Sequence, residues 1–268
     1  MSMTMTPTTS SASRDFLAAT VPLTIGYILV SSGMQSLIGY ALIVLSLVIV
    51  VATKQSGERN YMFWLWLGVV ILSITPIGTE VNVYHAVFMT AGMLGALILP
   101  YALAHYYDAR SFIHMGLNFR RRWTGREIGY VVFAVVMTGF WQPLYFLTTD
   151  AHVNWDLDNA VSIMVSFAVI MIIGLWEEFF FIALVLTIAK RYVSFWAANI
   201  IQASMFTSFL FQMGFHGWIV PLILVYALYQ GYVFHVTRSL LITISIHAMV
   251  DLIVFLSLLY STRPDLFS

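Results

Sequence analysis

Long apolar runs separated by short polar segments make up most of the chain. Nine of these runs approach the ~20 residues with which an α-helix crosses ~30 Å of hydrocarbon at ~1.5 Å per residue. They are continuous instead of alternating, and a lipid-exposed backbone has to satisfy its own hydrogen bonds, so the runs predict helices and not strands. The predicted spans cover residues 16–32, 36–53, 61–78, 84–107, 128–147, 160–189, 194–212, 218–236 and 240–260.

This pattern predicts an all-α fold, a polytopic transmembrane helical bundle of about eight to nine spans. The first two runs are joined only by residues 33–35 and could also form a re-entrant hairpin. Residues 1–15 are rich in Ser, Thr and Met and predict a disordered cytoplasmic tail. No internal repeat is visible in the sequence. We expect residues 16–268 to form a single membrane domain without a soluble appendage.

Composition agrees with a membrane protein and removes several classes of function. Hydrophobic residues make up 60% of the chain and charged residues 9%, whereas soluble domains carry about a quarter charged residues. The formal net charge is zero, so nucleic acid is not an expected partner. The lack of cysteine excludes disulfides, thiol nucleophiles and cysteine-based metal sites. We expect an integral, multi-pass protein of the cell (plasma) membrane with the lipid bilayer as its surroundings.

The basic residues predict the orientation of the bundle. With a cytoplasmic N-terminus, eleven of the twelve Lys and Arg residues fall on the cytoplasmic side, and Arg263 alone lies outside. We therefore expect the N-terminus inside and the C-terminus outside. The eleven are Arg14, Lys54, Arg59, Arg110, Arg120, Arg121, Arg122, Arg126, Lys190, Arg191 and Arg238.

Ionisable residues within the spans are the candidates for chemistry, because a charge at the bilayer centre costs at least ~2.5–3.5 kcal/mol. Glu177 and Glu178 lie deep in the sixth span, His247 and Asp251 lie in the ninth, and His216 lies at the glycine-flanked break between the seventh and eighth. Glu177 and Glu178 point ~100° apart, so we expect different roles for them. His247 and Asp251 are spaced i, i+4 on one helix face, where the carboxylate can orient the imidazole.

Several functions are compatible with these residues alone. Converging carboxylates and histidines suit water activation, and Glu177, His216, His247 and Asp251 could also supply the ligands of a metal such as zinc. The same groups could form hydrogen-bonded packing pairs between helices. In an ion-coupled transporter, Glu177 and Asp251 could carry protons, although no inverted repeat is visible.

The order of these residues resembles the motifs EExxxR, FxxxH and HxxxN or HxxxD of the CAAX prenyl protease and bacteriocin-processing (Abi) family of intramembrane endopeptidases. Glu177-Glu178 matches the first motif, His216 the second and His247-Ala-Met-Val-Asp251 the third. The resemblance covers residues 160–260, which we take as a protease-like core. Two positions depart from the motifs, since Ile182 stands at the arginine and Gln212 at the phenylalanine.

The resemblance implies an endopeptidase that hydrolyses a peptide bond in a site buried in the membrane, without a metal or other cofactor. Glu177 would be the general base that activates water, and His216 would help to hold that water. His247 and residue 251 would stabilise the oxyanion, with Asp251 acting either as a protonated donor or by orienting His247. The expected substrate is a peptide or a membrane protein, and the sequence does not indicate the oligomeric state.

Two features of the sequence weigh against a complete site. Ile182 deprives Glu178 of an arginine one turn away, and Arg238 is a conceivable substitute. A straight helix from Ser194 would carry His216 ~33 Å across the membrane, so the site closes only if that helix starts late, tilts or breaks near Gly214. The departures at Ile182 and Gln212 keep a second hypothesis open, a catalytically reduced membrane scaffold or regulator.

Overall fold

The structure is a computed structural model that describes residues 10–34, 36–53, 56–79, 83–107, 116–117, 119, 121–149 and 157–267. Every regular element in these ranges is helical, which confirms the predicted fold class. The elements are α1 (Ser10–Ser31), α2 (Ser36–Ala52), α3 (Ser56–Ile74), α4 (Val83–Tyr107), α5 (Gly125–Thr148), α6 (Ala160–Glu177), the π-helix η1 (Glu178–Leu186), α7 (Thr187–Ala189), α8 (Phe195–Gln212), the 3₁₀ turn η2 (Gly217–Ile219), α9 (Val220–Thr237), α10 (Leu240–Thr262) and the 3₁₀ turn η3 (Pro264–Phe267).

Six helical segments among the described residues are long and apolar enough to cross a membrane. They are α1, α4, α5, the continuous α6–η1–α7 segment, α9 with the preceding η2 turn, and α10. Helices α2 and α3 are apolar but shorter. Each of the nine predicted spans coincides with a helix, so the bundle is polytopic as expected.

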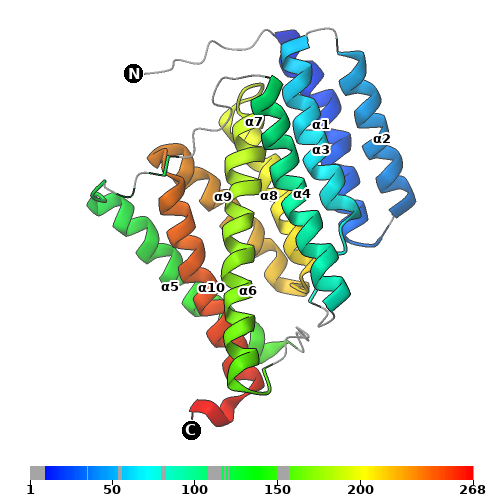
Figure 1. Cartoon of the computed structure of the whole chain (residues 1–268). Helices are drawn as coiled ribbons and strands as arrows, with labels where there is room; N and C mark the ends of the chain where they lie inside the picture. Colours follow the sequence, from blue (N-terminus) through cyan, green and yellow to red (C-terminus); the bar gives the residue numbers. More distant parts are fainter. Residues whose placement is uncertain are drawn as a thin grey trace.

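The continuous segment α6–η1–α7 runs through the middle of the bundle (Figure 1). On one side of it lie α1 to α4, with α1 packed against α2, α3 and α8. On the other side lie α5 and α10, which pack against each other. Within the segment, η1 contacts α4, α8, α9 and α10. All η1 residues except Phe179 are buried, so this stretch forms the core of the bundle.

Polar caps set where several helices begin. Thr124 caps α5 in a capping box, in which its side chain accepts from the Glu127 backbone and the Glu127 side chain accepts from the Thr124 backbone. This box starts α5 at Gly125, three residues before the predicted span. Asn159 caps α6 and Ser194 caps α8 in the same general way, through side-chain oxygens that accept backbone N–H groups.

The first helix begins earlier than the sequence predicts, within the residues that were expected to form a disordered tail. Helix α1 begins at Ser10, so residues 10–15 are helical and not a tail. Ala12 is buried, Ser13 donates to the carbonyl of Tyr192, and the ring of Phe16 stacks on that of Tyr192 at 4.5 Å. These contacts extend the first helix beyond its apolar run. Residues 1–9 lie outside the described residues.

The arrangement of helix ends is compatible with the predicted orientation. Helix α1 begins at the top of Figure 1, and α10 ends at the bottom. Lys190 follows α7 and Arg238 precedes α10, both at the upper end of the bundle, whereas Arg263 follows α10 at the lower end. Lys54, Arg110 and Arg120 lie outside the described residues. Which end faces the cytoplasm stays a prediction.

Candidate active site

The two neighbouring glutamates lie where the central helix changes its winding. Glu177 is the last residue of α6, and Glu178 is the first residue of η1. Single π turns within α-helices occur frequently at functional sites. Both side chains are almost fully enclosed, with 2% of Glu177 and 1% of Glu178 exposed. Two adjacent carboxyl groups thus lie in the interior of a membrane bundle.

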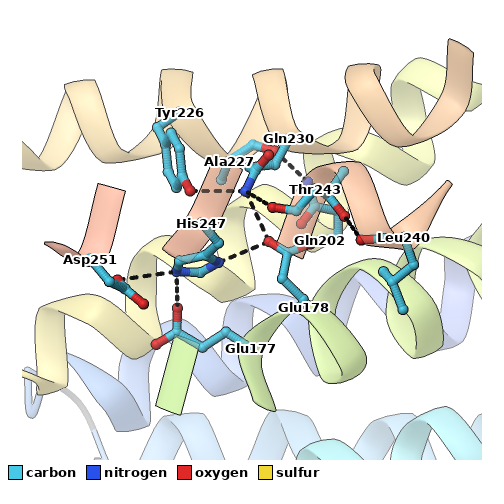
Figure 2. A network of polar contacts seen from close by, with 10 residues as sticks. All are labelled: Glu177, Glu178, Gln202, Tyr226, Ala227, Gln230, Leu240, Thr243, His247 and Asp251. Atoms are coloured by element: carbon cyan, nitrogen blue, oxygen red, sulfur yellow. Dashed lines mark hydrogen bonds and ion pairs between the residues drawn. The ribbon is translucent and has the colours of Figure 1, made fainter. Parts of the chain in front are cut away.

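Both glutamates contact the imidazole of His247 on α10, one on each ring nitrogen. Glu178 Oε1 lies 2.8 Å from Nδ1 in a hydrogen bond, and Glu177 Oε2 lies 3.2 Å from Nε2 in an ion pair. Figure 2 shows the imidazole in the middle of the network with a glutamate at each nitrogen. The two glutamates therefore share one partner, but each contacts a different nitrogen of its ring. This placement agrees with the expected ~100° between their directions.

Asp251 lies one turn beyond His247 on the same face of α10, as the i, i+4 spacing predicts. Its Oδ1 is 3.6 Å from His247 Nε2, which is within ion-pair range but longer than a hydrogen bond. Asp251 Oδ2 has no hydrogen-bond partner among the described residues, whereas the described contact of Glu177 Oε2 is its ion pair with His247. The Nε2 edge of the imidazole is thus flanked by two carboxyl groups, of which Asp251 keeps one oxygen without a described partner.

Helix α9 supplies two polar residues that the sequence analysis did not select. Gln230 Nε2 donates to Glu178 Oε1 at 2.9 Å, to the hydroxyl of Tyr226 at 2.8 Å and to the carbonyl of Thr243 at 3.3 Å. Figure 2 shows Tyr226 and Gln230 on the opposite side of the imidazole from Glu177. The available signal was a glutamine within an otherwise apolar span, but only ionisable residues were considered there.

Close approach of α6 to α10 depends on Gly174. A Cβ atom at this position would lie 2.0 Å from Asp251 Oδ2 and 3.2 Å from His247 Cδ2. Real Cβ contacts essentially never fall under ~3 Å, so any larger residue would displace the Asp251 carboxylate. The glycine lies one turn before Glu177. Its lack of a side chain allows the close approach of the two helices that carry the three carboxyl groups and the imidazole.

The cluster lies at a partly open cavity of about 410 Å³ that is lined by residues of α5, α6, α8, α9 and α10. Glu177, His247 and Asp251 line one part of it, and most of the remaining lining is apolar. Tyr226 and Gln142 add further polar side chains to the wall. A mostly apolar cavity with a few converging polar groups is the usual form of a binding or active site.

His216 is not part of this cluster. Helix α8 begins directly after Ser194 and ends at Gln212, and the chain then breaks at Gly214 and Gly217, whose φ angles are 99° and 74°. The predicted break exists, but it leaves the His216 ring against Phe211 at 4.2 Å, and the His216 backbone N–H donates to the Tyr145 hydroxyl. Helix α8 does not start late, and His216 is exposed beyond its end, so its described contacts do not include the cluster.

The departures at Ile182 and Gln212 have structural counterparts. Ile182 is buried within η1, and Glu178 finds His247 and Gln230 as partners in place of an arginine. Arg238 does not take that place, because it is an exposed residue in a left-handed conformation that caps the C-terminus of α9. The described contacts of Glu178 are thus an imidazole and a neutral amide.

The alternative metal set is not gathered at one point. Among the described residues, no three His, Asp or Glu side chains are placed so that they could hold one metal ion. His216 lies apart from Glu177, His247 and Asp251, as described above. The three remaining candidates are grouped around the Nε2 edge of the imidazole.

Comparison with protein families gives a match that begins at the N-cap of α6. Residues 159–253 match the family described as type II CAAX prenyl endopeptidase Rce1-like. We call residues 159–253 the Rce1-like segment, after the family to which this segment is similar. The Rce1-like segment contains all five candidate residues and ends within α10, shortly after Asp251. It confirms the resemblance and most of its predicted extent, whereas α1 to α5 lie outside the match.

No curated protein and no solved structure matches the chain. The Rce1-like segment and the six long apolar helices together identify an integral, multi-pass membrane protein.

Proposed function

We propose that this protein is an intramembrane endopeptidase that hydrolyses a peptide bond with water activated by Glu177. The arrangement of Glu177, His247 and Asp251 at one edge of a largely apolar cavity supports this proposal most directly. A family described as prenyl endopeptidases supports the choice of a peptidase. The Glu177 carboxyl lines the cavity beside His247, where it can accept the proton of the attacking water.

In the proposed reaction, Glu177 takes a proton from water while the water oxygen attacks the carbonyl carbon of the scissile bond. His247 Nε2 then donates a hydrogen bond to the oxyanion of the tetrahedral intermediate. The carbon–nitrogen bond breaks, and the proton held by Glu177 passes to the leaving nitrogen. The products are a new carboxyl group and a new amine, and the enzyme returns to its starting state.

The remaining polar residues position His247. Glu178 fixes Nδ1 at 2.8 Å, and Gln230 fixes Glu178 through its amide nitrogen. This chain of hydrogen bonds leaves Nε2 facing the cavity. Asp251 at 3.6 Å orients the same nitrogen from within α10. Such supporting hydrogen bonds commonly set the orientation and tautomer of a functional histidine.

The proposed substrate is a peptide or a segment of a membrane protein, because the cavity wall is mostly apolar. A prenylated C-terminal peptide is one candidate, following the description of the matched family. We propose that the reaction uses no cofactor, with a zinc-dependent variant as the alternative. The proposed location is the cell (plasma) membrane.

A catalytically reduced scaffold or regulator is the second candidate function. Ile182 in place of the motif arginine and the position of His216 outside the cluster favour it. In this case the cavity would hold a partner segment without cleaving it.

Cleavage by the purified protein in liposomes tests the proposal. A panel of peptides, with and without a prenyl group, is incubated in ¹⁸O-labelled water, and mass spectrometry identifies the products. We expect one ¹⁸O atom in the new carboxyl group and a loss of kcat of at least ~10²-fold for Glu177→Gln, the usual contribution of a general base.

Glu127→Gln is the matched control, because Glu127 is also a buried glutamate but belongs to the capping box of α5, which accepts glutamine. Equal cleavage by Glu177→Gln would reject the assigned base. Loss of wild-type activity on metal chelation, together with bound metal by elemental analysis, would favour the zinc variant. A wild-type protein that cleaves no peptide but retains a stable membrane partner would favour the scaffold.

A further inference from the structure

Gln142 on α5 is a buried polar residue that the proposed reaction does not use. Only 9% of it is exposed, and it lines the same cavity as Glu177 and His247. Its Oε1 has no hydrogen-bond partner among the described residues. A buried carbonyl oxygen without a partner costs about 1–3 kcal/mol, and most native structures avoid this cost.

Three other glutamines also have a side-chain oxygen without a described partner, but none of these lines the cavity. They are Gln202, Gln212 and Gln230. Gln202 and Gln230 hold neighbouring helices together through their amide nitrogens, which gives them a structural role. Gln142 differs because the residue that carries the unpartnered oxygen lines the cavity.

The chemistry of the cavity indicates what this oxygen would bind. An amide carbonyl accepts hydrogen bonds and cannot donate them, so its natural partner in an apolar cavity is an N–H group. An extended peptide brings one backbone N–H per residue, and each of these loses its water on entry. The wall formed by α6 and α10 presents carboxyl groups and an imidazole to the reacting carbonyl, and α5 supplies the amide.

We propose that Gln142 is a substrate-positioning residue that accepts a hydrogen bond from a backbone N–H of an extended, apolar peptide segment. The proposal rests on the proposed peptide substrate and extends it by assigning α5 to substrate binding. The N–H contacted by Gln142 belongs to a residue near the scissile bond, since the same cavity holds both groups. This contact fixes the peptide in register relative to Glu177.

A binding experiment tests the proposal separately from cleavage. A labelled peptide of alternating leucine and alanine is titrated onto the detergent-solubilised full chain carrying Glu177→Gln, which keeps the peptide intact. A set of analogues replaces one backbone amide at a time by an ester, which removes a single N–H. We expect one ester position to weaken binding by about tenfold, and Gln142→Leu to weaken binding of the all-amide peptide by a similar factor.

The decisive experiment measures the binding of the sensitive ester analogue to Gln142→Leu. In Gln142→Leu, the sensitive ester should cause no further loss, because its hydrogen-bond partner is already absent. Gln212→Leu is the matched control, since it removes an equally unpartnered glutamine oxygen outside the cavity, and it should leave the ester effect intact.

Each of three results would overturn the proposal. They are an absence of peptide binding, an ester effect that persists in Gln142→Leu, and stronger binding of an alkyl chain such as that of a detergent in Gln142→Leu, which would identify a lipid site. Peptide binding of the expected kind without cleavage by the wild type would leave the Gln142 contact supported and reject the peptidase alone.

Discussion

His247 has both ring nitrogens in contact with carboxyl groups from the central helix, at 2.8 Å for Glu178 and 3.2 Å for Glu177. The described contacts of this cluster include no Lys or Arg side chain. Charges in a low-dielectric interior are costly unless they are paired and hydrogen-bonded. The imidazole is therefore the one described partner that the three carboxyl groups share, and its loss should affect both chemistry and packing.

Substitution of the two candidate histidines should show whether both motif histidines, or only the one in the described cluster, contribute to activity. We expect His247→Ala to lower kcat at least ~10²-fold, since it removes the Nε2 group that faces Glu177. His216→Ala should lower kcat less than about tenfold, because its described contacts are with Phe211 and Tyr145. Steady-state cleavage by both variants in liposomes measures this, and melting temperatures in detergent verify folding. An equal loss in the two variants would place His216 back in the site.

The sequence indicated the ionisable members of the cluster because their signals are local. Glu177 and Glu178 are adjacent, and His247 and Asp251 are one helical turn apart, so each pair lies together once its helix forms. No local pattern in the sequence indicates Gln230, Tyr226 or Gln142. Their positions near the cluster depend on how α5 and α9 pack against the helices that carry it. The described contacts of His216 lie outside the cluster, because a motif gives the order of residues but not their positions in space.

At the scale of helices, Gly174 sets the distance between α6 and α10. We expect Gly174→Ala to lower kcat by at least about tenfold, because the new Cβ would occupy space within 2.0 Å of Asp251 Oδ2. The carboxylate sits on a short side chain next to His247, and small displacements of reacting groups reduce rates strongly. Cleavage kinetics and thermal unfolding of the purified variant measure the effect.

Gly139→Ala is the matched control for this prediction. Gly139 lies within α5, and an added Cβ there would meet nothing within 4 Å. Alanine in place of glycine in a helix interior stabilises by about 0.5–1 kcal/mol, so this variant should keep its activity and melt at the same or a higher temperature. A Gly174→Ala variant that behaves like Gly139→Ala would show that α6 and α10 do not need the close approach.

The positions of the helices could be predicted well because lipid imposes a simple rule on length and polarity. All nine predicted spans coincide with helices. The sequence did not predict that α1 starts at Ser10, because its first turn is polar and is held by Ser13 and Phe16 against Tyr192. It also did not predict the π-helix after Glu177, since an apolar run gives no indication of its winding.

At the scale of the whole molecule, Lys190 should make stability depend on pH in the alkaline range. Burial at the end of α7, together with the nearby positive charge of Arg238, lowers the pKa of Lys190 to about 8. The unfolded chain has an ordinary lysine with a pKa of 10.5, so it binds more protons than the folded chain between these two values. The free energy of unfolding should therefore rise as the pH increases from about 8 to 10.5.

Thermal unfolding in detergent across this pH range measures the effect, and Lys190→Gln is the comparison. We expect the melting temperature of the wild type to rise relative to that of Lys190→Gln as the pH increases. The difference should be modest because water reaches part of the side chain. A constant difference between the two proteins from pH 8 to 10.5 would contradict the assigned shift.

The enclosure of η1 has a consequence for how the bilayer can influence this protein. Eight of its nine residues are buried, and α4, α8, α9 and α10 all contact it. Lipid thickness and lateral pressure act first on the outer helices, which have wide surfaces toward the acyl chains. Glu178 is the first residue of η1, which those forces reach only through the packing of its neighbours, so the geometry of the proposed site is shielded from changes in the surrounding membrane.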